Sequence, residues 1–587
     1  MHPGLQKLAE EFQNGRISRR ELTWRASGFV GGLALTSFLA ACGADDENAP
    51  ANTPTPTSSA NEEEEPTATS DAGAQPTEAE GGSEPEETPE ESGEAKSGGT
   101  FSFPIIADPI FNPLLSSGVQ SVMVNKVLFN GLVKPEPGTL QPVPDLAESW
   151  EPNEDFTEWT FQLRQDVKWH DGEPFTADDV VFTYDRRMNE EGVSAAFKEL
   201  TACEKVDDYT VRFTLSEPLG HFPVLMSYNQ FIVPKHILEG QKMTDFTEFS
   251  IENPIGTGPY MLEEFIAGNY VSTIKNPNFF LGEPNIERFV FKILPDVNSQ
   301  VAQLRTGELT FATIEPVNVE TLQNAQGLVI DPIDYVNHYY IAFQCPRAPF
   351  DDQRVRLALA LAIDRQAIVD SVTLGYGTIA TSTIPTALEW AFNDELDPMP
   401  FDPDRALEIL AEAGWEKNSD GILEKDGEPL AFTLSCDRGN PAREQTVTIV
   451  QQMFNDLGCQ VDLELMDWGS FSQQRWLAED YEAMHMWWIT APDPDQLEYY
   501  GCDGDNNHPN FCNEEITEVL EQARRTADME ERRQLYYRYQ ELTMEDPPVA
   551  VLYYPKEIRV YTERLKNVPN IGIRDAFIYS YQMWLDD

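Results

Sequence analysis

Three consecutive segments decide the fold class of this chain: LAFTLSC (residues 430–436), REQTVTIVQQMFNDLG (443–458) and CQVDLELMDW (459–468). The first and third have the short, alternating or apolar character of strands, whereas the middle one has the length of a helix and ends at a glycine. A strand, a helix and a strand in this order are typical of a parallel sheet. We therefore expect an α/β fold, and work outward from this unit.

The same alternation of strands and helices continues toward the N-terminus. Two segments alternate as strands do: 157–164 and 209–215. Between them, Thr176 and Asp179 have the spacing of a capping box, which predicts the start of a helix. The segment FDDQRVRLALALAIDRQAIVDSV (350–372) carries an apolar stripe at helical spacing, and Asp351 or Asp352 can cap it.

The N-terminal segment SRRELTWRASGFVGGLALTSFLAAC (18–42) predicts export. Its apolar part, 26–41, has only sixteen residues, which is short for a membrane-spanning helix and fits a secretion signal. The pair Arg19 and Arg20 suits a twin-arginine signal, although general secretory export stays open. The ending LAAC matches a bacterial lipobox, so we expect lipidation of Cys42, with an uncut anchor helix as the alternative.

Residues 43–97 read as a stalk between this signal and the folded body. The segment contains 16 Asp and Glu against one Lys, no aromatic residue, and many Pro, Thr, Ser and Gly. Such a composition cannot bury enough apolar surface to fold, and proline and like charges keep it extended. We therefore predict a disordered stalk that holds the body away from a membrane surface.

The length and charge of the remainder limit its function. Residues 98–587 are too many for one hydrophobic core and suggest two or three domains. The net charge of −59, from 41 Lys and Arg against 100 Asp and Glu, argues against nucleic acid as a partner. Acidity of this kind also fits adaptation to salt.

Seven cysteines remain to be assigned. With Cys42 lipidated, six are left, and an even number outside the cytoplasm permits disulfides. The ten-residue separation of Cys502 and Cys512 in a polar stretch favours a bond between these two. The spacing of the cysteines does not match a zinc site.

A longer stretch resembles a known family. GLVKPEPGTLQPVPDLAESWEPNEDFTEWTFQLRQDVKWHDGEPFTADDVVFTYDR (131–186) closely resembles the family 5 extracellular solute-binding proteins, the oligopeptide-, dipeptide- and nickel-binding components of ABC importers. Further matches, in order, are NPIGTGPY, RTGEL, APFDDQRVRLALALAIDRQAIVD, AEAGW and VLYYPKEIRVY. The resemblance covers residues 98–587.

The resemblance implies a two-lobed, class II periplasmic-binding-protein-like α/β fold. Hinge strands would join the lobes, which close around the ligand, and an extra α+β domain would pack on the first lobe. The implied boundaries are 98–134, 234–334 and 560–587 for the first lobe, 135–233 for the extra domain, and 335–559 for the second lobe. The implied function is capture of a solute for a separate permease and ATPase by a lipid-anchored, extracytoplasmic monomer without a cofactor.

The resemblance also implies where a ligand would touch. In the first lobe these residues would lie along a bound peptide: Ser116, Ser117, Gly118 and Val119. In the second lobe the implied contacts are Trp468, Trp487, Trp488, Tyr553 and Tyr554. Aromatic side chains with polar tips suit varied ligands. Because side chains alternate along a strand, only one of Trp487 and Trp488 should face the cleft, and we favour Trp488.

At one place the sequence departs from the peptide-binding relatives. They carry an aspartate after the tryptophan strand that pairs with the ligand's α-ammonium group, whereas this chain has Thr490 or Ala491 there. The next acidic residues are Asp493 and Asp495. A buried ammonium without a carboxylate is costly. The ligand is therefore an oligopeptide read by a shifted aspartate, or a different solute such as an oligosaccharide or a metal chelate.

Other chemistries find little support. His485 is a single histidine and makes a poor metal site. The segment DGDNNHPNFCNE (503–514) has part of a calcium-loop spacing, but His508 replaces the glycine of the turn, which favours a polar surface loop. The chain lacks the G-x-S-x-G and H-E-x-x-H motifs. A secreted glycosidase remains the alternative from another class, and it would need two carboxylates at suitable separation.

Overall fold

The computed structural model describes residues 95–115, 118–193, 197–245, 248–572 and 576–586. The chain divides into two compact units, 1–93 and 94–587, and the fold below is that of the second. The predicted signal, the lipidation residue Cys42 and most of the predicted stalk lie outside the described residues. Within the described ranges, every helix is too short or too polar to cross a lipid bilayer.

A four-stranded sheet has the order β1-β10-β9-β8. Its strands are β1 (Thr100–Ile105), β8 (Tyr260–Ile266), β9 (Tyr270–Lys275) and β10 (Arg288–Ile293). β1 runs parallel to β10, whereas the other pairs are antiparallel. Alternate residues of β1 and β10 build a phenylalanine-rich core, in which Phe101 stacks on Phe289 with ring centres 4.0 Å apart.

A second four-stranded sheet is antiparallel, with the order β4-β5-β7-β6. It contains β4 (Ala147–Pro152), β5 (Glu158–Leu163), β6 (Leu200–Asp207) and β7 (Thr210–Leu215), and α5 (Ala177–Asn189) packs against it. The predicted strands 157–164 and 209–215 are confirmed as β5 and β7. The predicted capping box is confirmed, with Thr176 and Asp179 each bonding the other's backbone.

The largest sheet has eight strands along the path β11-β21-β13-β20-β18-β19, with β12 and β14 also paired to β21. Its strands are β11 (Phe311–Ile314), β12 (Leu328–Asp334), β13 (Asn337–Phe343), β14 (Gly377–Ile379), β18 (Ala431–Asp437), β19 (Gln460–Met466), β20 (Ala483–Ile489) and β21 (Val549–Thr562). The strand–helix–strand unit predicted from 430–468 is confirmed, because β18 and β19 are parallel and are linked by α14 (Pro441–Leu457).

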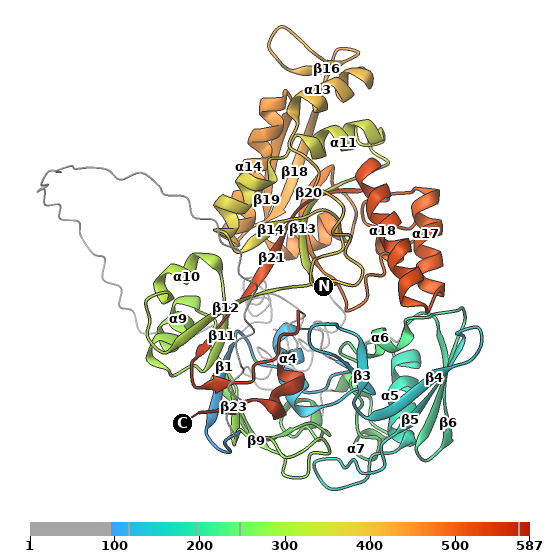
Figure 1. Cartoon of the computed structure of the whole chain (residues 1–587), viewed down its shortest axis with the longest axis vertical. Helices are drawn as coiled ribbons and strands as arrows, with labels where there is room; N and C mark the ends of the chain where they lie inside the picture. The colour runs from blue at the N-terminus through green and yellow to red at the C-terminus, as the bar shows by residue number, and fades with distance from the viewer. Residues whose placement is uncertain (1–94, 116–117, 194–196, 246–247, 573–575, 587) are drawn as a thin grey trace, which may run out of the picture. The chain divides into compact units, whose positions relative to one another are not determined.

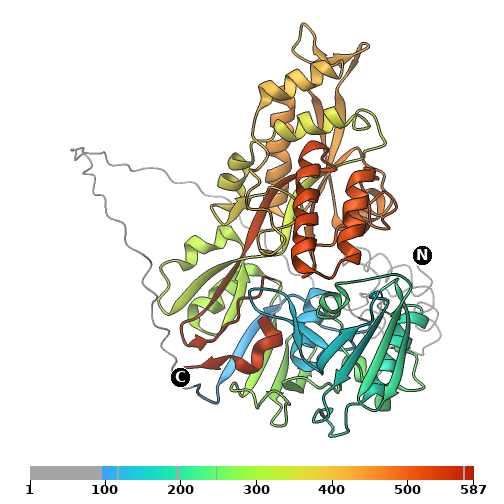
Figure 2. The ribbon, with the colours of Figure 1, turned by 45° about the vertical axis from the view of Figure 1, so that its right-hand side comes forward.

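Helices cover both faces of this sheet. Ile341 and Phe343 of β13 pack with α11 (Gln353–Leu361), α13 (Pro403–Glu412) and α14, whereas Tyr340 and Ala342 pack with α17 (Glu514–Arg525) and α18 (Met529–Glu545). Figures 1 and 2 show the two helix groups on opposite sides of the strands. The period-two alternation of β13 therefore separates two cores.

β21 is unusually long and belongs to two groups of strands. Its first half, Val549 to Tyr553, pairs with β13, and its second half, from Lys556 onward, pairs with β12 and β11. β12 and β13 are also consecutive in sequence and separated by two residues. Figure 1 shows β21 running from β11 and β12 to the sheet of β13 and β20. Two stretches of chain thus pass between these groups side by side.

One predicted element differs in detail. The stretch 350–372 forms α11, then a short helix α12 (Arg365–Ile368) and a π-helical turn, Val369–Thr373, instead of one continuous helix. Asp352 caps α11 as predicted. The break occurs because Asp364 accepts a hydrogen bond from the backbone of Ala367 and begins a new helix.

The other α-helices and β-strands of the described ranges are short. They are β2 (Val133–Pro135), β3 (Pro142–Pro144), α4 (Val119–Leu128), α6 (Phe222–Met226), α7 (Lys235–Leu238), α8 (Glu248–Ile251), α9 (Val297–Thr306), α10 (Pro316–Leu322), β15 (Glu416–Lys417), β16 (Leu423–Lys425), β17 (Glu428–Pro429), α15 (Trp468–Phe471), α16 (Leu497–Tyr500), β22 (Leu565–Lys566) and β23 (Trp584–Leu585).

Candidate ligand-binding site

The C-terminal end of β20 carries two adjacent tryptophans on opposite faces of the sheet. β13 and β20 are antiparallel, and their register places Tyr339 beside Trp487 and His338 beside Trp488. The ring of Trp487 lies 5.4 Å from that of Trp468, whereas Trp488 lies 4.8 Å from Tyr499 of α16. Trp488 also lies 6.3 Å from Trp476, whose ring is 6.1 Å from Trp468, so the two side chains are connected through neighbouring tryptophans.

Trp468 is the most exposed of the candidate aromatic residues. It follows Asp467, whose side chain caps the short helix α15, and 43% of its surface is exposed. Its ring centre lies 6.1 Å from Trp476 and 5.4 Å from Trp487. Clustered, exposed aromatic rings are typical of interaction surfaces. We call Trp468, Trp476 and Trp487 the tryptophan cluster.

A cation lies against this cluster. Arg443, at the start of α14, places its guanidinium carbon 3.8 Å from the ring centre of Trp487. The same guanidinium donates a 2.6 Å hydrogen bond to Asp437 at the end of β18. Burial raises the pKa of Asp437, and the charge of Arg443 opposes that rise. The cluster thus has a stacked ion pair on Trp487, next to the exposed ring of Trp468.

Tyr553 and Tyr554 lie deeper than their predicted position on a binding surface. Tyr553 is buried and stacks on Tyr339 with ring centres 4.8 Å apart. Tyr554 is also buried, and its hydroxyl accepts from the backbone of Thr381 and Ser382. The structure gives Tyr554 a role in the core, because a fully engaged and buried hydroxyl has no capacity left for a solute.

The segment after β20 is tied to α18. Thr490 is buried and extends the strand pairing, since its backbone nitrogen donates to Val336 at 2.7 Å. Asp493 is buried and accepts two hydrogen bonds from Arg532, at 2.8 and 2.9 Å. The expectation that Asp493 is free to meet a ligand amine is therefore wrong for this structure, because the carboxylate already has a bidentate partner.

Asp495 is engaged as well. It accepts a 2.8 Å hydrogen bond from Arg524 of α17 and lies 3.5 Å from the ring of His221. Burial by itself would raise the pKa of Asp495, but the nearby His221 ring and the charge of Arg524 hold the pKa below its usual value. As with Asp493, the expectation of a free carboxylate for a ligand is wrong for this structure.

Sequence reasoning missed the residues that complete this ion network. Glu199 and Lys198 precede β6, and His221 precedes α6, more than 260 residues before the segment they meet. Glu199 lies 3.2 Å from Arg524, and Lys198 lies 2.6 Å from Glu498. No local motif marks such residues, because the pairs form only when distant segments come together.

The predicted early loop is only partly described. Gly118 and Val119 are exposed and begin α4, with Gly118 in the capping position. Ser116 and Ser117 lie outside the described residues. Contact of this loop with a ligand stays a prediction.

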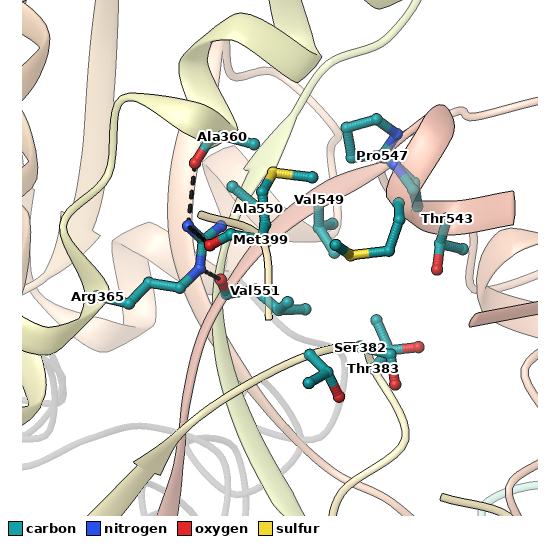
Figure 3. Close-up of a pocket in the computed structure, with 13 residues that line it drawn as sticks. Ala360, Arg365, Ser382, Thr383, Met399, Thr543, Pro547, Val549, Ala550 and Val551 are labelled. Atoms are coloured by element: carbon teal, nitrogen blue, oxygen red, sulfur yellow. Dashed lines mark hydrogen bonds between the residues drawn. The ribbon is translucent and has the colours of Figure 1, made fainter. Parts of the chain in front are cut away.

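A small cavity lies inside the core of the largest sheet, between Arg365, Met399 and Val551 (Figure 3). Its volume is about 20 Å³. Arg365 donates to the carbonyls of Val551 at 2.7 Å and Ala360 at 3.0 Å, and burial lowers its pKa to about 10. A cavity of this size holds about one water molecule, whereas sites for small organic ligands occupy hundreds of cubic ångströms. This cavity is therefore not the solute site.

The cysteines and metal-type residues have structural surroundings. Cys502 and Cys512 form the predicted disulfide. His485 is buried beside Cys436, and burial together with the charge of Arg443 lowers its pKa to about 3, which keeps the ring neutral. In the stretch 503–514, Asn507 donates to the carbonyls of Gly501 and Phe511. Within the described ranges, no three His, Cys, Asp or Glu side chains are grouped to hold a metal ion.

Comparison with known proteins places these features in context. Residues 141–509 match the model of the bacterial extracellular solute-binding proteins, family 5. The oligopeptide-binding protein AppA of Bacillus subtilis is 30% identical over 509 residues, which cover 84% of this chain and 92% of AppA. The dipeptide-binding protein of Escherichia coli is 28% identical over 471 residues, covering 75% and 86% of the two chains.

Solved structures show the same similarity. AppA from Bacillus subtilis, in complex with a nonapeptide, matches with a TM-score of 0.71 at 30% identity, over 84% of this chain and 100% of that chain. NikZ from Campylobacter jejuni, in complex with Ni(L-His), matches with a TM-score of 0.70 at 26% identity, over 83% and 99% of the chains. The expected periplasmic-binding-protein-like α/β fold is confirmed by these neighbours.

Proposed function

The chain belongs to the bacterial extracellular solute-binding proteins of family 5, and from this membership we propose that it captures an oligopeptide outside the cytoplasm for an ABC importer. The observation that carries the proposal is the tryptophan cluster beside the end of β20, in which Trp468 is exposed, in a chain whose relatives are named as oligopeptide- and dipeptide-binding proteins. Flat aromatic faces contact a peptide backbone and varied side chains without demanding one sequence.

We place the solute between two lobes. The first comprises 98–134, 234–334 and 560–587, the second 335–559, and the extra domain 135–233. The separate hydrophobic cores of β1 to β10, of β4 to β7 and of the largest sheet support this division. β21 and the β12–β13 connection supply two antiparallel stretches of chain that suit a hinge.

We also propose that the protein is a lipid-anchored monomer. Lipid on Cys42 holds it to the membrane, the acidic stalk 43–97 spaces it from the surface, and a permease and an ATPase on other chains accept the solute. The composition of 18–97 supports this reading. The protein binds its solute and releases it chemically unchanged.

A ligand screen by thermal unfolding tests the proposal. Peptides of two to nine residues are added to the protein purified without its N-terminal 97 residues, and to the full chain in detergent. A ligand at 100 times its Kd adds about 3 kcal/mol of stability, so a bound peptide raises the Tm by several degrees. Mass spectrometry of the recovered peptide shows whether it is intact. Cleavage of the peptide would contradict a binding-only role, and a panel in which no peptide raises the Tm would contradict the peptide assignment.

A further inference from the structure

Ionic contacts join the proposed extra domain to the proposed second lobe. Glu199 lies 3.2 Å from Arg524, and Lys198 lies 2.6 Å from Glu498. The backbone nitrogen of Gly220 also donates to the carbonyl of Arg524 at 3.1 Å. We call this set of contacts, between the start of α6 and the end of α17, the junction.

The junction lies away from the strands that connect the two lobes. Figure 1 shows α6 and α17 at the right of the view, and β11 and β12 at its left. The chain passes between the lobes through β21 and the β12–β13 connection. Because rotation about a hinge moves the most distant parts furthest apart, a contact at the junction forms when the lobes are closed and separates when they open.

The extra domain is fixed to the first lobe by hydrogen bonds of its own. The backbone nitrogen of Gly256 donates to the ring of His170 at 3.1 Å, and the other ring nitrogen lies 3.0 Å from the carbonyl of Gly258. Asp179 accepts from the backbone nitrogen of Lys235 at 2.9 Å. Movement of the first lobe would therefore carry the extra domain with it, and the junction would open and close with the cleft.

His221 lies at the junction between two carboxylates. It directly precedes α6 and is buried, and its Nε2 lies 3.5 Å from Asp495 and 3.9 Å from Asp493. Neither ring nitrogen has a hydrogen bond to a described residue. Histidine is the side chain whose charge ordinarily changes between about pH 5 and 8. A proton on Nε2 would turn both of these contacts into attractive charge pairs.

The surrounding charges favour that proton. Among the described residues, the charged groups of the junction are the carboxylates of Glu199, Asp493, Asp495, Glu498 and Asp505 and the cations Lys198, Arg524 and Arg532. Burial and the two guanidiniums oppose a further positive charge, but each guanidinium is already bonded to a carboxylate beside His221. Tyr499 and Tyr536 also lie near these carboxylates, and burial raises the pKa of both hydroxyls, so they stay neutral. Five carboxylates thus meet three cations, and a proton on His221 reduces the excess of negative charge.

We propose that the junction is a latch that holds the closed form, and that protonation of His221 tightens the latch. Because the proton is bound more strongly in the closed form, closure is favoured in acid and weakens as the pH rises. The protein then holds its solute more firmly at about pH 5.5 than at about pH 8. This inference rests on the proposed function for the two lobes and their closure, and on the ionic contacts for the latch.

Energy transfer across the junction tests the latch without a ligand. In the full chain in detergent, with Cys42→Ser, a donor and an acceptor dye that do not respond to pH are attached through Ser216→Cys and Glu518→Cys, at two exposed positions on either side of the junction. The described cysteines without a disulfide partner are buried, which protects them from the dyes. The fraction of closed, high-transfer molecules should rise about threefold or more from about pH 8 to about pH 5.5.

Variants of this labelled protein separate the proton from the latch. His221→Phe and His221→Gln should show the same closed fraction at both pH values, because neither side chain gains a proton. Glu199→Gln removes the carboxylate that faces Arg524, so it should lower the closed fraction about fivefold at both pH values and keep the rise in acid. His236→Gln, at a part-exposed histidine paired with Asp171, is the control and should behave as the labelled parent protein does.

Each outcome decides. A closed fraction that is the same at both pH values in the parent protein, or a rise in acid that persists in either folded His221 variant, would overturn the role of His221. A closed fraction that Glu199→Gln leaves unchanged would overturn the latch. A peptide that binds with equal Kd at both pH values would contradict the latch and leave peptide capture intact. If closure depends on pH as expected but no peptide binds, the latch stands and the peptide function fails. Urea unfolding at both pH values confirms that each variant is folded.

Discussion

Glu199 and Arg524 form an ion pair of 3.2 Å across 325 residues of sequence, and both side chains are buried. Glu199 precedes β6 of the antiparallel sheet, and Arg524 lies in the last turn of α17, so the pair joins the proposed extra domain to the proposed second lobe. Arg524 also holds Asp495 and Glu498. One guanidinium therefore pairs with three carboxylates at this junction.

This arrangement predicts unequal effects of two substitutions. Arg524→Met leaves three acidic groups without their arginine and should lower the free energy of unfolding by about 3–5 kcal/mol. Glu199→Gln leaves Arg524 with two partners and should cost about 1 kcal/mol. Urea unfolding measures both. Arg538→Met, which removes an exposed pair with Glu515, is the control and should change stability by less than about 1 kcal/mol. Equal losses for Arg524→Met and Arg538→Met would show that the junction is not stabilising.

A substitution of Asp493 distinguishes a role in stability from a role in ligand binding. Because its carboxylate is bonded to Arg532 and close to the Tyr536 hydroxyl, Asp493→Asn should lower the free energy of unfolding by about 3 kcal/mol or more. A ligand-binding aspartate would behave differently, since its loss would weaken binding and leave stability nearly unchanged. Chemical unfolding and calorimetry on the same variant separate these roles.

Trp468 should matter for binding and little for folding. Its side chain is 43% exposed at the surface, so Trp468→Ala should change the free energy of unfolding by only about 0.5 kcal/mol. An aromatic contact at the centre of a binding surface is worth about 2 kcal/mol or more, so the Kd should rise roughly 30-fold. Phe401→Ala, at another exposed aromatic residue, is the control and should leave the Kd unchanged. If Trp468→Ala binds the ligand as tightly as wild type, the ligand does not bind at the tryptophan cluster.

Parts of the fold were predictable from the sequence because the residues that determine them act on nearby positions of the chain. Thr176 with Asp179, and Asp352, act on backbone groups within a few positions, so their spacing reveals the helix starts. The unit 430–468 combines period-two and helical patterns, which predicted the parallel strands β18 and β19. Alternation predicts that only one of Trp487 and Trp488 faces a ligand, and this stays a prediction, because Trp487 lies beside Trp468 while Trp488 lies beside Trp476.

Other features depend on contacts that sequence spacing does not encode. Asp493 and Asp495 are only two residues apart in the sequence, but their side chains pair with arginines on two different helices. Asp493 pairs with Arg532, 39 residues away, and Asp495 pairs with Arg524, 29 residues away. Tyr554 shares the aromatic character of a binding residue, but its neighbours Thr381 and Ser382 come from a segment about 170 residues earlier. The sequence pattern shows which types of side chain are present, and the tertiary contacts decide which of these side chains are left available to a ligand.

The anchor can be tested without a ligand. Cys42→Ser should leave the precursor uncut or release the protein from the membrane fraction, because the lipobox cysteine is both the cleavage marker and the lipid carrier. Mass spectrometry of the wild-type protein should show a diacylglyceryl modification at an N-terminal Cys42. Cys203→Ser, at a buried cysteine of the folded body, is the control and should stay membrane-bound. An unmodified Cys42 within an intact wild-type precursor would contradict lipidation.

Buried neutral histidines should make the protein sensitive to acid. His338 is fully buried, its ring lies 5.4 Å from that of Tyr340, and burial lowers its pKa to about 3 from the ordinary 6.5. Between pH 6.5 and 3, His338 is therefore protonated in the unfolded chain and neutral in the folded chain. Stability from this group is complete above pH 6.5 and falls as the pH is lowered, by about 1.4 kcal/mol per pH unit.

Replacement of His338 isolates this contribution. His338→Phe keeps a planar ring beside Tyr340 and removes the proton-binding nitrogens, so the loss of stability between pH 6.5 and 4.5 should be smaller than in wild type by about 2 kcal/mol. Urea unfolding at the two pH values measures the difference within each protein, which cancels any change in packing common to both conditions. His236→Gln, at a part-exposed histidine paired with Asp171, is the control and should keep the contribution of His338 intact. If wild type and His338→Phe lose the same stability on acidification, then His338 is protonated in the folded protein, and the core around it is open to water.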